Sequence, residues 1–313
     1  MHYSDFGLAD TKHLLNRALK GGYAVPAFNF YNMETLFAIL RAAEITKSPV
    51  ILAVSESALK YIGPNVLMGM INGVKHKKNQ VALHLDHGHS FESCKKAVDM
   101  GFSSVMFDGS NLPLKKNIEI SKRVTDYAHK FNASAETELG ILAGIEDENT
   151  SADEHLYTNP DIVADFVRQT NTDFLAVAIG TAHGIHKRNN SKDKIRFDIL
   201  KQIINNIPKT PLVLHGASTI PQKFITTINK YGGNIKNAKG TSPAQIRHAI
   251  KLHITKINVD SDSRLAFTSA VREKLYKDQE NFAPRQYLGS AMDKMTQNCV
   301  NEIINIMGSA NKI

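Results

Sequence analysis

The sequence has 313 residues, of which 42% are hydrophobic and 22% are charged, and its formal net charge at pH 7 is +8. These values exclude a disordered chain and are ordinary for a globular enzyme with a large core. The positive charge suits an anionic partner, but Lys and Arg are scattered among acidic residues, without aromatic residues interleaved. We therefore favour a phosphorylated small molecule over nucleic acid as the partner.

The two cysteines, Cys94 and Cys299, lie far apart in the sequence and form no Cys-x-x-Cys pair, which favours a reducing cytoplasm. Residues 1–22 include Asp5 and Asp10, where a secretory signal would need an unbroken apolar core. No apolar run approaches the roughly 18 residues of a membrane span. We expect a soluble, cytoplasmic protein that does not associate with membranes.

Short apolar strands alternate with longer segments of helical spacing, after a first helix expected over residues 8–20. Eight strands are expected, over residues 23–30, 49–55, 81–87, 104–108, 133–139, 174–180, 211–215 and 256–260. Helical spacing occurs over residues 33–46, 91–100, 114–130, 161–168 and 197–207. This alternation predicts a parallel sheet covered by helices.

Eight such units predict an α/β fold with a closed (β/α)8 barrel, the TIM barrel, as a single domain over residues 1–313. No Gly-x-Gly-x-x-Gly turn follows the first strand, which counts against an open dinucleotide-binding sheet. Two polar segments, near residues 140–159 and 181–196, are expected to be mobile loops at the barrel end that carries active sites. Residues 283–313 are expected to form a helical C-terminal extension.

A histidine precedes a glycine at the ends of three predicted strands, at His87, His183 and His215. Parallel barrel strands end at one mouth, so the three imidazoles predict a metal site with a position open for substrate. Zinc suits three imidazoles best, with cobalt or manganese as alternatives. Asp86 reaches the same site as His87 only if the strand turns there, which Gly88 permits. The other histidines considered fall in mid-strand, loop or helix and are excluded: His84, His89, His186, His248 and His253.

Glycine-rich turns after the sixth, seventh and eighth strands are typical of phosphate-binding loops in this fold. Their backbone amides lie at Gly184, at 216–218 and at 259–261. Positive charge for a phosphate is available from Lys187, Arg264 and Arg285. Glycine is also common in plain turns, and most surface cations are only solvated, so this evidence is weaker than the histidine pattern.

Seven motifs occur in order along nearly the full chain, at residues 27–30, 84–88, 136–140, 144–147, 180–184, 214–218 and 258–262. Together they closely resemble the class II, metal-dependent fructose-bisphosphate aldolases. The resemblance implies reversible cleavage of fructose 1,6-bisphosphate to dihydroxyacetone phosphate and glyceraldehyde 3-phosphate, a reaction of glycolysis and gluconeogenesis. It implies a Zn2+ cofactor and leaves room for a monovalent cation.

The resemblance also implies roles for individual residues. Zinc would be held by His87, His183 and His215, and Asp86 would be the catalytic acid and base. Two further carboxylates near the metal, and a loop acid that exchanges the proton on the carbanion carbon, are implied at Asp108, Glu138 and Glu146. Two departures from many relatives remove no implied ligand: Asp-Gly-Ser-Asn at 108–111 in place of Asp-Ala-Ser-His, and Thr137 in place of Ala. They leave the surroundings of the metal open.

Substrate contacts are implied by the same resemblance. Substrate oxygens would be bound by Asn29, Ser55, Asn258 and Asp260, and the phosphate of dihydroxyacetone phosphate by Gly184, Gly216, Ser218 and Ser261. Arg264 and Arg285 would bind the other phosphate, the latter across the interface of a homodimer or larger homo-oligomer. Asn29 has a rival role as a helix cap, and Arg285 has one in a surface ion pair.

Other functions account for only part of the pattern. Tagatose-1,6-bisphosphate aldolase is the nearest, but that branch resembles Asn-Val-Ala-Thr where this chain has Asn-Val-Asp-Ser at 258–261. A zinc hydrolase would leave the phosphate-binding features and the acidic loop unused. A non-catalytic phosphosugar-binding barrel would leave the metal ligands and proton carriers unused. A Schiff-base aldolase needs a lysine at the C-terminal end of a strand, whereas Lys256 is expected at the start of the eighth.

Overall fold

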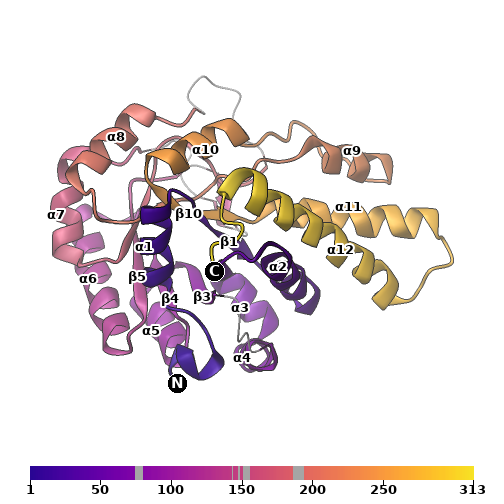
Figure 1. The fold of residues 1–313 in the computed structure, drawn as a ribbon, viewed down its shortest axis with the longest axis horizontal. Helices are drawn as coiled ribbons and strands as arrows, with labels where there is room; N and C mark the ends of the chain where they lie inside the picture. The colour runs from indigo at the N-terminus through magenta and orange to yellow at the C-terminus, as the bar shows by residue number, and fades with distance from the viewer. Residues whose placement is uncertain (75–79, 143, 147–148, 151–155, 186–193) are drawn as a thin grey trace.

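The computed structural model describes residues 1–74, 80–142, 144–146, 149–150, 156–185 and 194–313. Eight parallel strands close into a barrel in the order β1-β10-β9-β8-β5-β4-β3-β2 (Figure 1). Their bounds are β1 Val25–Asn29, β2 Val50–Ser55, β3 Val81–Gly88, β4 Ser104–Phe107, β5 Ser134–Leu139, β8 Phe174–Val177, β9 Leu212–Leu214 and β10 Ile254–Val259. The closed (β/α)8 barrel predicted from the sequence is confirmed.

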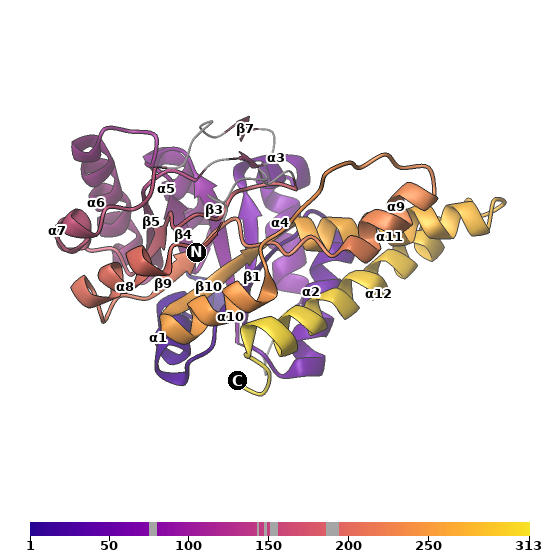
Figure 2. The same cartoon turned by 90° about the horizontal axis from the view of Figure 1, so that it is seen from above.

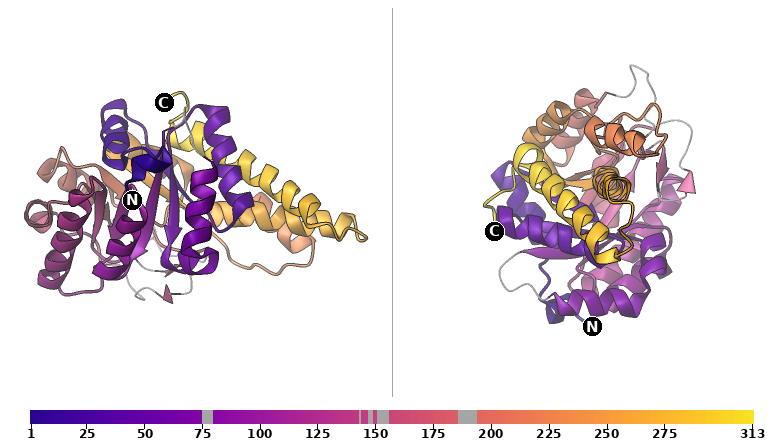
Figure 3. Two further views of the ribbon diagram at one scale, coloured as in Figure 1. Left: turned by 90° about the horizontal axis from the view of Figure 1, so that it is seen from below. Right: turned by 90° about the vertical axis from the view of Figure 1, so that its right-hand side faces the viewer.

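Helices surround the strands (Figure 3). Their bounds are η1 Tyr3–Phe6, α1 Thr11–Gly21, α2 Met33–Thr46, α3 Glu56–Ile62, α4 Pro64–Gly73, α5 Phe91–Met100, α6 Leu114–Lys130, α7 Pro160–Thr170, α8 Phe197–Asn206, α9 Gln222–Lys230, α10 Pro243–Leu252, α11 Ser261–Lys277, α12 Pro284–Glu302 and η2 Ile303–Met307. Helices α2, α5 and α6 have the bounds that their apolar spacing predicted. Asn32 and Ser90 cap α2 and α5 with their side-chain oxygens, which explains why these helices begin where they do.

Every residue of the eight barrel strands is buried, because helices cover the outer face and side chains fill the interior. Successive side chains alternate between these two faces. Outward residues such as Leu83 and Leu85 pack against the helices, and inward residues such as Val25, Ala27 and Ile51 form a second apolar cluster. Polar residues at inward positions are therefore gathered inside the barrel.

Helices α11 and α12 extend away from the barrel as an antiparallel pair, with α9 beside them (Figures 1 and 2). We call the pair of α11 and α12 the arm. Helix α12 returns along α2, where Thr296 Oγ1 donates a hydrogen bond to the backbone oxygen of Ala38 at 3.3 Å. The chain then forms the π-helical turn η2, whose Met307 oxygen accepts a hydrogen bond from Ala24 N at 3.0 Å. This return path joins the end of the chain to the start of β1.

Two short strands, β6 (Ile145–Glu146) and β7 (Asn149–Thr150), form an antiparallel pair within the first predicted loop. Residues 143, 147–148 and 151–155 of that loop, and 186–193 of the second, lie outside the described residues. The mobility expected of both loops stays a prediction. In the described part of the chain, no helix combines the length and the apolar character needed to cross a membrane.

Candidate active site

The end of β3 brings Asp86 and His87 to one side of the barrel mouth. The pairing of β3 with β4 shifts register between Leu85 and Gly88, and His87 has a left-handed φ of 49°. The irregularity that the sequence required at this strand end is present, and His87, not Gly88, has the left-handed conformation. Gly88 is needed for a different reason: a Cβ there would lie 2.7 Å from both Cys94 Sγ and the Met106 carbonyl oxygen.

The imidazoles of the three His-Gly pairs lie together at this mouth. His87 Nε2 is 2.9 Å from His215 Nδ1. The ring of His183 has its centroid 5.2 Å from that of His87 and 6.2 Å from that of His215. All three side chains are buried. Residues that are far apart in the sequence therefore form one cluster.

Two of these histidines, His87 and His215, have donor atoms that converge with carboxylate oxygens as a divalent metal requires, whereas His183 is in neither of the converging groups. One atom each from Asp86, His87 and His215 lie within 4.8 Å of one another, and so do atoms from His87, Asp108 and Glu138. Burial, with nearby positive charge, lowers the pKa of His215 well below its usual value, so its imidazole is neutral, the form that binds metals. Imidazole nitrogens with neighbouring carboxylates suit zinc, cobalt or manganese.

Asp108 orients the ring of His87. Its Oδ2 is 3.1 Å from His87 Nδ1. Burial raises the pKa of Asp108, but the hydrogen bond and charge of His87 outweigh this effect and hold the pKa far below its usual range. A Cβ on the following Gly109 would lie 2.4 Å from Asn117 Oδ1. Asn117 in turn donates to the backbone oxygen of Glu138 at 3.0 Å.

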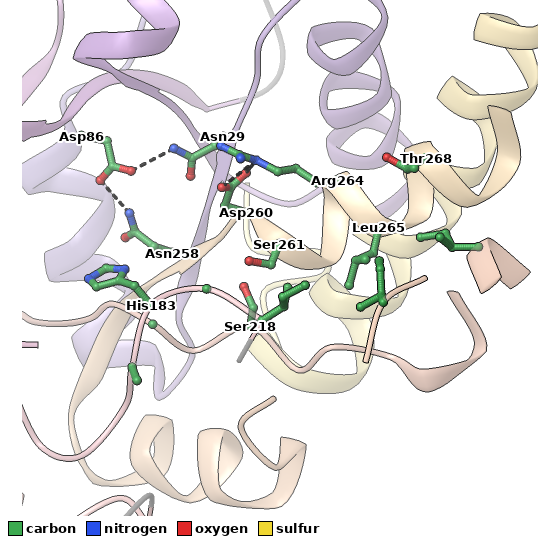
Figure 4. A pocket seen from close by; sticks show the side chains of 16 residues that line it. Asn29, Asp86, His183, Ser218, Asn258, Asp260, Ser261, Arg264, Leu265 and Thr268 are labelled. Atoms are coloured by element: carbon green, nitrogen blue, oxygen red, sulfur yellow. Dashed lines mark hydrogen bonds and ion pairs between the residues drawn. The ribbon is translucent and has the colours of Figure 1, made fainter. Parts of the chain in front are cut away.

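Two amides hold the carboxylate of Asp86 (Figure 4). Asn29 Nδ2 donates to Oδ2 at 2.9 Å, and Asn258 Nδ2 donates to Oδ1 at 2.7 Å. Burial raises the pKa of Asp86, but the electrostatic effects of its basic neighbours, His87 first and Lys256 among them, and the Asn29 hydrogen bond outweigh it and lower the pKa to about 2. The carboxylate is therefore ionised near neutral pH and fixed in orientation.

A cavity of about 530 Å³ opens beside this carboxylate. Of the residues predicted to serve the site, those that line it are Asn29, Asp86, His183, Gly184, Gly216, Ser218, Asn258, Asp260, Ser261 and Arg264 (Figure 4). The amide oxygens of Asn29 and Asn258 are buried, with no hydrogen-bond partner among the described residues. Buried polar atoms are normally satisfied, so these two oxygens indicate a polar ligand.

Backbone amides gather at one end of the cavity. The loop of Gly216 passes so close to Ala182 that a Cβ on Gly216 would lie 2.7 Å from the Ala182 carbonyl, and its φ is +62°. Helix α11 begins at Ser261, which also lines the cavity. A helix N-terminus with glycine-rich loops beside it favours an anion such as phosphate.

Tyr31 is a cavity-side residue that the sequence did not single out. Its hydroxyl donates to Asp260 Oδ1 and accepts from Arg264, whose Nε and Nη2 lie 2.9 Å and 2.6 Å away. The guanidinium also lies over the Tyr31 ring, 4.6 Å from its centroid, and 2.9 Å from Asp260 Oδ2. Aromatic and acidic groups thus fix the arginine at the cavity. A lone tyrosine after β1 gave no signal in the sequence.

Four of the residues predicted for catalysis or substrate binding are not among those that line the cavity. Ser55 is buried at the end of β2, where its Oγ caps α3 through Ala58 N at 3.2 Å. Arg285 is exposed near the start of α12. Lys187 lies outside the described residues. The backbone of Glu146 is in β6, which follows Gly144, itself bridged to His183.

A charged cluster below the histidines was also missed. Lys256 was expected at the start of its strand, but β10 begins at Ile254 and Lys256 is fully buried within it. Its Nζ lies 2.8 Å from Glu136 Oε2 and 3.4 Å from His84 Nε2. His84 is a buried core residue, as expected. The sequence did contain a signal for this position: Lys256 and Asn258 are two residues apart on one strand, so both side chains point to the inward face.

The chain was compared with known proteins. The family model described as "Fructose-bisphosphate aldolase class-II" matches residues 9–312. A "Fructose-bisphosphate aldolase" of Treponema pallidum (strain Nichols) is 43% identical over 99% of this chain and 99% of its own. One of Thermus caldophilus is 44% identical over 96% and 97%.

A solved structure has the same fold. The crystal structure of the YdjI aldolase from Escherichia coli K12 is 29% identical, with a TM-score of 0.77 over 97% of this chain and 99% of that one. Aldolases of this kind are lyases, so the comparisons make the chain an enzyme of that class. On the family match and the two relatives together, this chain belongs to the class II fructose-bisphosphate aldolase family.

Proposed function

We propose that this protein reversibly cleaves fructose 1,6-bisphosphate to dihydroxyacetone phosphate and glyceraldehyde 3-phosphate, as a step of glycolysis and gluconeogenesis. The observation that carries the proposal is the Asp86 carboxylate, held by two amides beside three converging histidines. The names of the relatives favour fructose over tagatose bisphosphate as the substrate. Neither a hydrolase nor a non-catalytic barrel is needed to explain the residues.

Asp86 is the group that moves the first proton. Cleavage begins when the hydroxyl on the fourth carbon loses its proton, and an ionised carboxylate in the cavity accepts it. Asn29 and Asn258 hold both carboxylate oxygens, which keeps Asp86 from rotating away. Their own amide oxygens accept hydrogen bonds from substrate hydroxyls. In the condensation direction, Asp86 returns the proton.

His87, His183 and His215 would hold the metal, for which we propose zinc, with Asp108 and Glu138 beside it. A bound divalent metal supplies Lewis-acid stabilisation of the negative charge that develops on the ketose half. We assign to Glu146 the exchange of the proton on the carbanion carbon. A monovalent cation beside the substrate phosphate stays a prediction.

The two phosphates are assigned to separate ends of the site. The backbone and hydroxyl groups of Gly184, Gly216, Ser218 and Ser261 bind one of them, helped by the positive end of α11. Arg264, with Lys187 and Arg285 as further cations, binds the other. Arg285 is exposed on the arm outside the cavity. We therefore assign Arg285 to the site of a neighbouring subunit in a homodimer or larger assembly.

We assign the protein to the cytoplasm. Cys94 and Cys299 are both buried as free thiols, and burial raises the pKa of each well above its usual value. Such thiols suit a reducing compartment.

A coupled cleavage assay tests the proposed reaction. Fructose and tagatose 1,6-bisphosphates are compared, each with and without EDTA, and each after treatment with borohydride. We expect cleavage of the fructose epimer to be faster, to be lost in EDTA, and to survive borohydride, because no lysine forms a Schiff base. Equal rates in EDTA would refute the metal mechanism. Faster cleavage of the tagatose epimer would refute the substrate assignment.

A further inference from the structure

The barrel core contains a continuous chain of polar side chains below the candidate metal site. His215 Nε2 is 2.7 Å from Glu136 Oε1, and Glu136 Oε2 is 2.8 Å from Lys256 Nζ. Lys256 is also 3.4 Å from His84 Nε2, and His84 Nδ1 is 2.8 Å from Ser104 Oγ. The side chains of Glu136, Lys256 and His84 have no exposed surface.

The position of Glu136 decides which nitrogen of His215 carries a proton. A carboxylate can only accept hydrogen bonds, so His215 Nε2 donates to it. The other nitrogen, Nδ1, then presents a lone pair toward His87 Nε2, which lies 2.9 Å away. Carboxylates that fix the tautomer and ring orientation of metal-binding histidines are a general feature of metal sites.

We propose that Lys256 is a positioning residue for the metal site, which acts on His215 through Glu136. One Glu136 oxygen holds His215 and the other is held by Lys256, so the ammonium fixes the carboxylate that fixes the ring. His84 contacts Lys256 on another side and is anchored through Ser104, which accepts a hydrogen bond from Thr11 Oγ1 at 2.8 Å. This assignment rests on the proposed metal function of His215.

Stability alone does not explain this ion pair. Taking two charges out of water costs about as much as their attraction returns, and apolar replacements of buried pairs are often neutral or stabilising. The interior position next to it on β10, Asn258, already serves the cavity. A charged pair at this depth is therefore better explained by the orientation that it imposes on His215 than by its contribution to folding.

The experiment measures metal binding without substrate. Metal-free protein is titrated with Zn2+ against a chromophoric chelator, and the absorption spectrum of the Co2+-loaded protein is recorded. The variants are Lys256→Met, the double variant Lys256→Met/Glu136→Gln, and Thr255→Val as a matched control. Thr255 is equally buried on the same strand but donates to the Leu212 backbone oxygen at 3.1 Å.

We expect Lys256→Met to bind Zn2+ about 10-fold to 100-fold more weakly and to shift the Co2+ spectrum, as loss of such outer partners typically does. Thr255→Val should change melting temperature only. The double variant has no buried unpaired charge, so it should fold even if Lys256→Met does not, and still bind Zn2+ at least about 10-fold more weakly.

Wild-type affinity in folded Lys256→Met, or in the double variant, would overturn the role of Lys256 and leave the proposed function standing. Absence of metal binding by the wild-type protein would overturn both.

Discussion

Two of the buried carboxylate clusters in the described part of the molecule have opposite surroundings. In the barrel core, Glu136 faces Lys256 and His215. At the base of the arm, Glu302 of α12 faces Asp262 of α11, and burial, followed by the charge of Asp262, raises the pKa of Glu302 well above its usual value. A cation stabilises a buried carboxylate as an anion, whereas a second carboxylate favours keeping a proton. The two carboxylates are equally buried but have opposite partners.

The arm cluster also reaches the cavity. Asp262 accepts hydrogen bonds from Thr219 N and Oγ1 at 2.7 Å and 2.8 Å, and from Ile220 N at 2.7 Å. These backbone groups directly follow Ser218, which lines the cavity. Glu302 thus lies against an acid that anchors a candidate phosphate loop. The core cluster contacts His215, the proposed metal ligand, and the arm cluster contacts a loop.

Removing the charge of Asp86 at the barrel mouth should have the largest effect on catalysis. In Asp86→Asn the side chain keeps its shape but cannot accept a proton, so kcat should fall about 10²-fold to 10⁴-fold. Zn2+ affinity should change much less, because the histidines remain. Steady-state kinetics and chelator competition measure the two quantities. Asp293→Asn, an exposed pair partner of Arg41, is the matched control and should change neither. A variant that keeps near wild-type kcat would contradict the role of Asp86.

Glu302→Gln should change how the free energy of unfolding depends on pH, because Glu302 faces an acid and not a cation. The folded protein holds the Glu302 proton more tightly than the unfolded chain does. The free energy of unfolding is therefore highest below the usual Glu pKa and falls as pH rises toward the raised value, by up to about 1.4 kcal/mol per pH unit. Gln cannot ionise, so the variant should lose this slope.

Urea unfolding of both proteins from pH 4 to pH 8 measures the difference, and Glu273→Gln is the control. Glu273 lies on α11, where the hydrogen bond from Lys277 lowers its pKa. Parallel pH profiles for wild type and Glu302→Gln would contradict a protonated Glu302.

Much of this fold could be predicted because its signals are local or periodic. Apolar strands alternating with helical spacing give a (β/α)8 barrel, and strand ends in such a barrel meet at one mouth. That topology was enough to predict that His87, His183 and His215 lie together, although 96 residues separate the first two and 32 separate the last two. The family resemblance then supplied Asn29 and Asn258, which no spacing rule selects.

The features that were missed depend on tertiary contacts. Next to the turn at His87, Cys94 and Met106 leave no room for a Cβ on Gly88. Lys256 is unusual only because Glu136 from another strand meets it inside the barrel. A sequence gives the identity of a buried charge but not its partner, and the partner determines what the charge does.

Tyr31→Phe should give the smallest effect, because its cluster is open to solvent. The Arg264 and Asp260 side chains are 45% and 30% exposed, and exposed ion pairs contribute little. Losing the Tyr31 hydroxyl removes hydrogen bonds worth about 1 kcal/mol, so kcat/KM for fructose 1,6-bisphosphate should fall about five-fold, mainly through KM. Tyr61→Phe, whose ring is 79% exposed, is the matched control. A fall in kcat of about 100-fold at unchanged KM would instead mean that Tyr31 acts on the reacting atoms. The solvent exposure of a cluster would then not predict how strongly a variant in it affects catalysis.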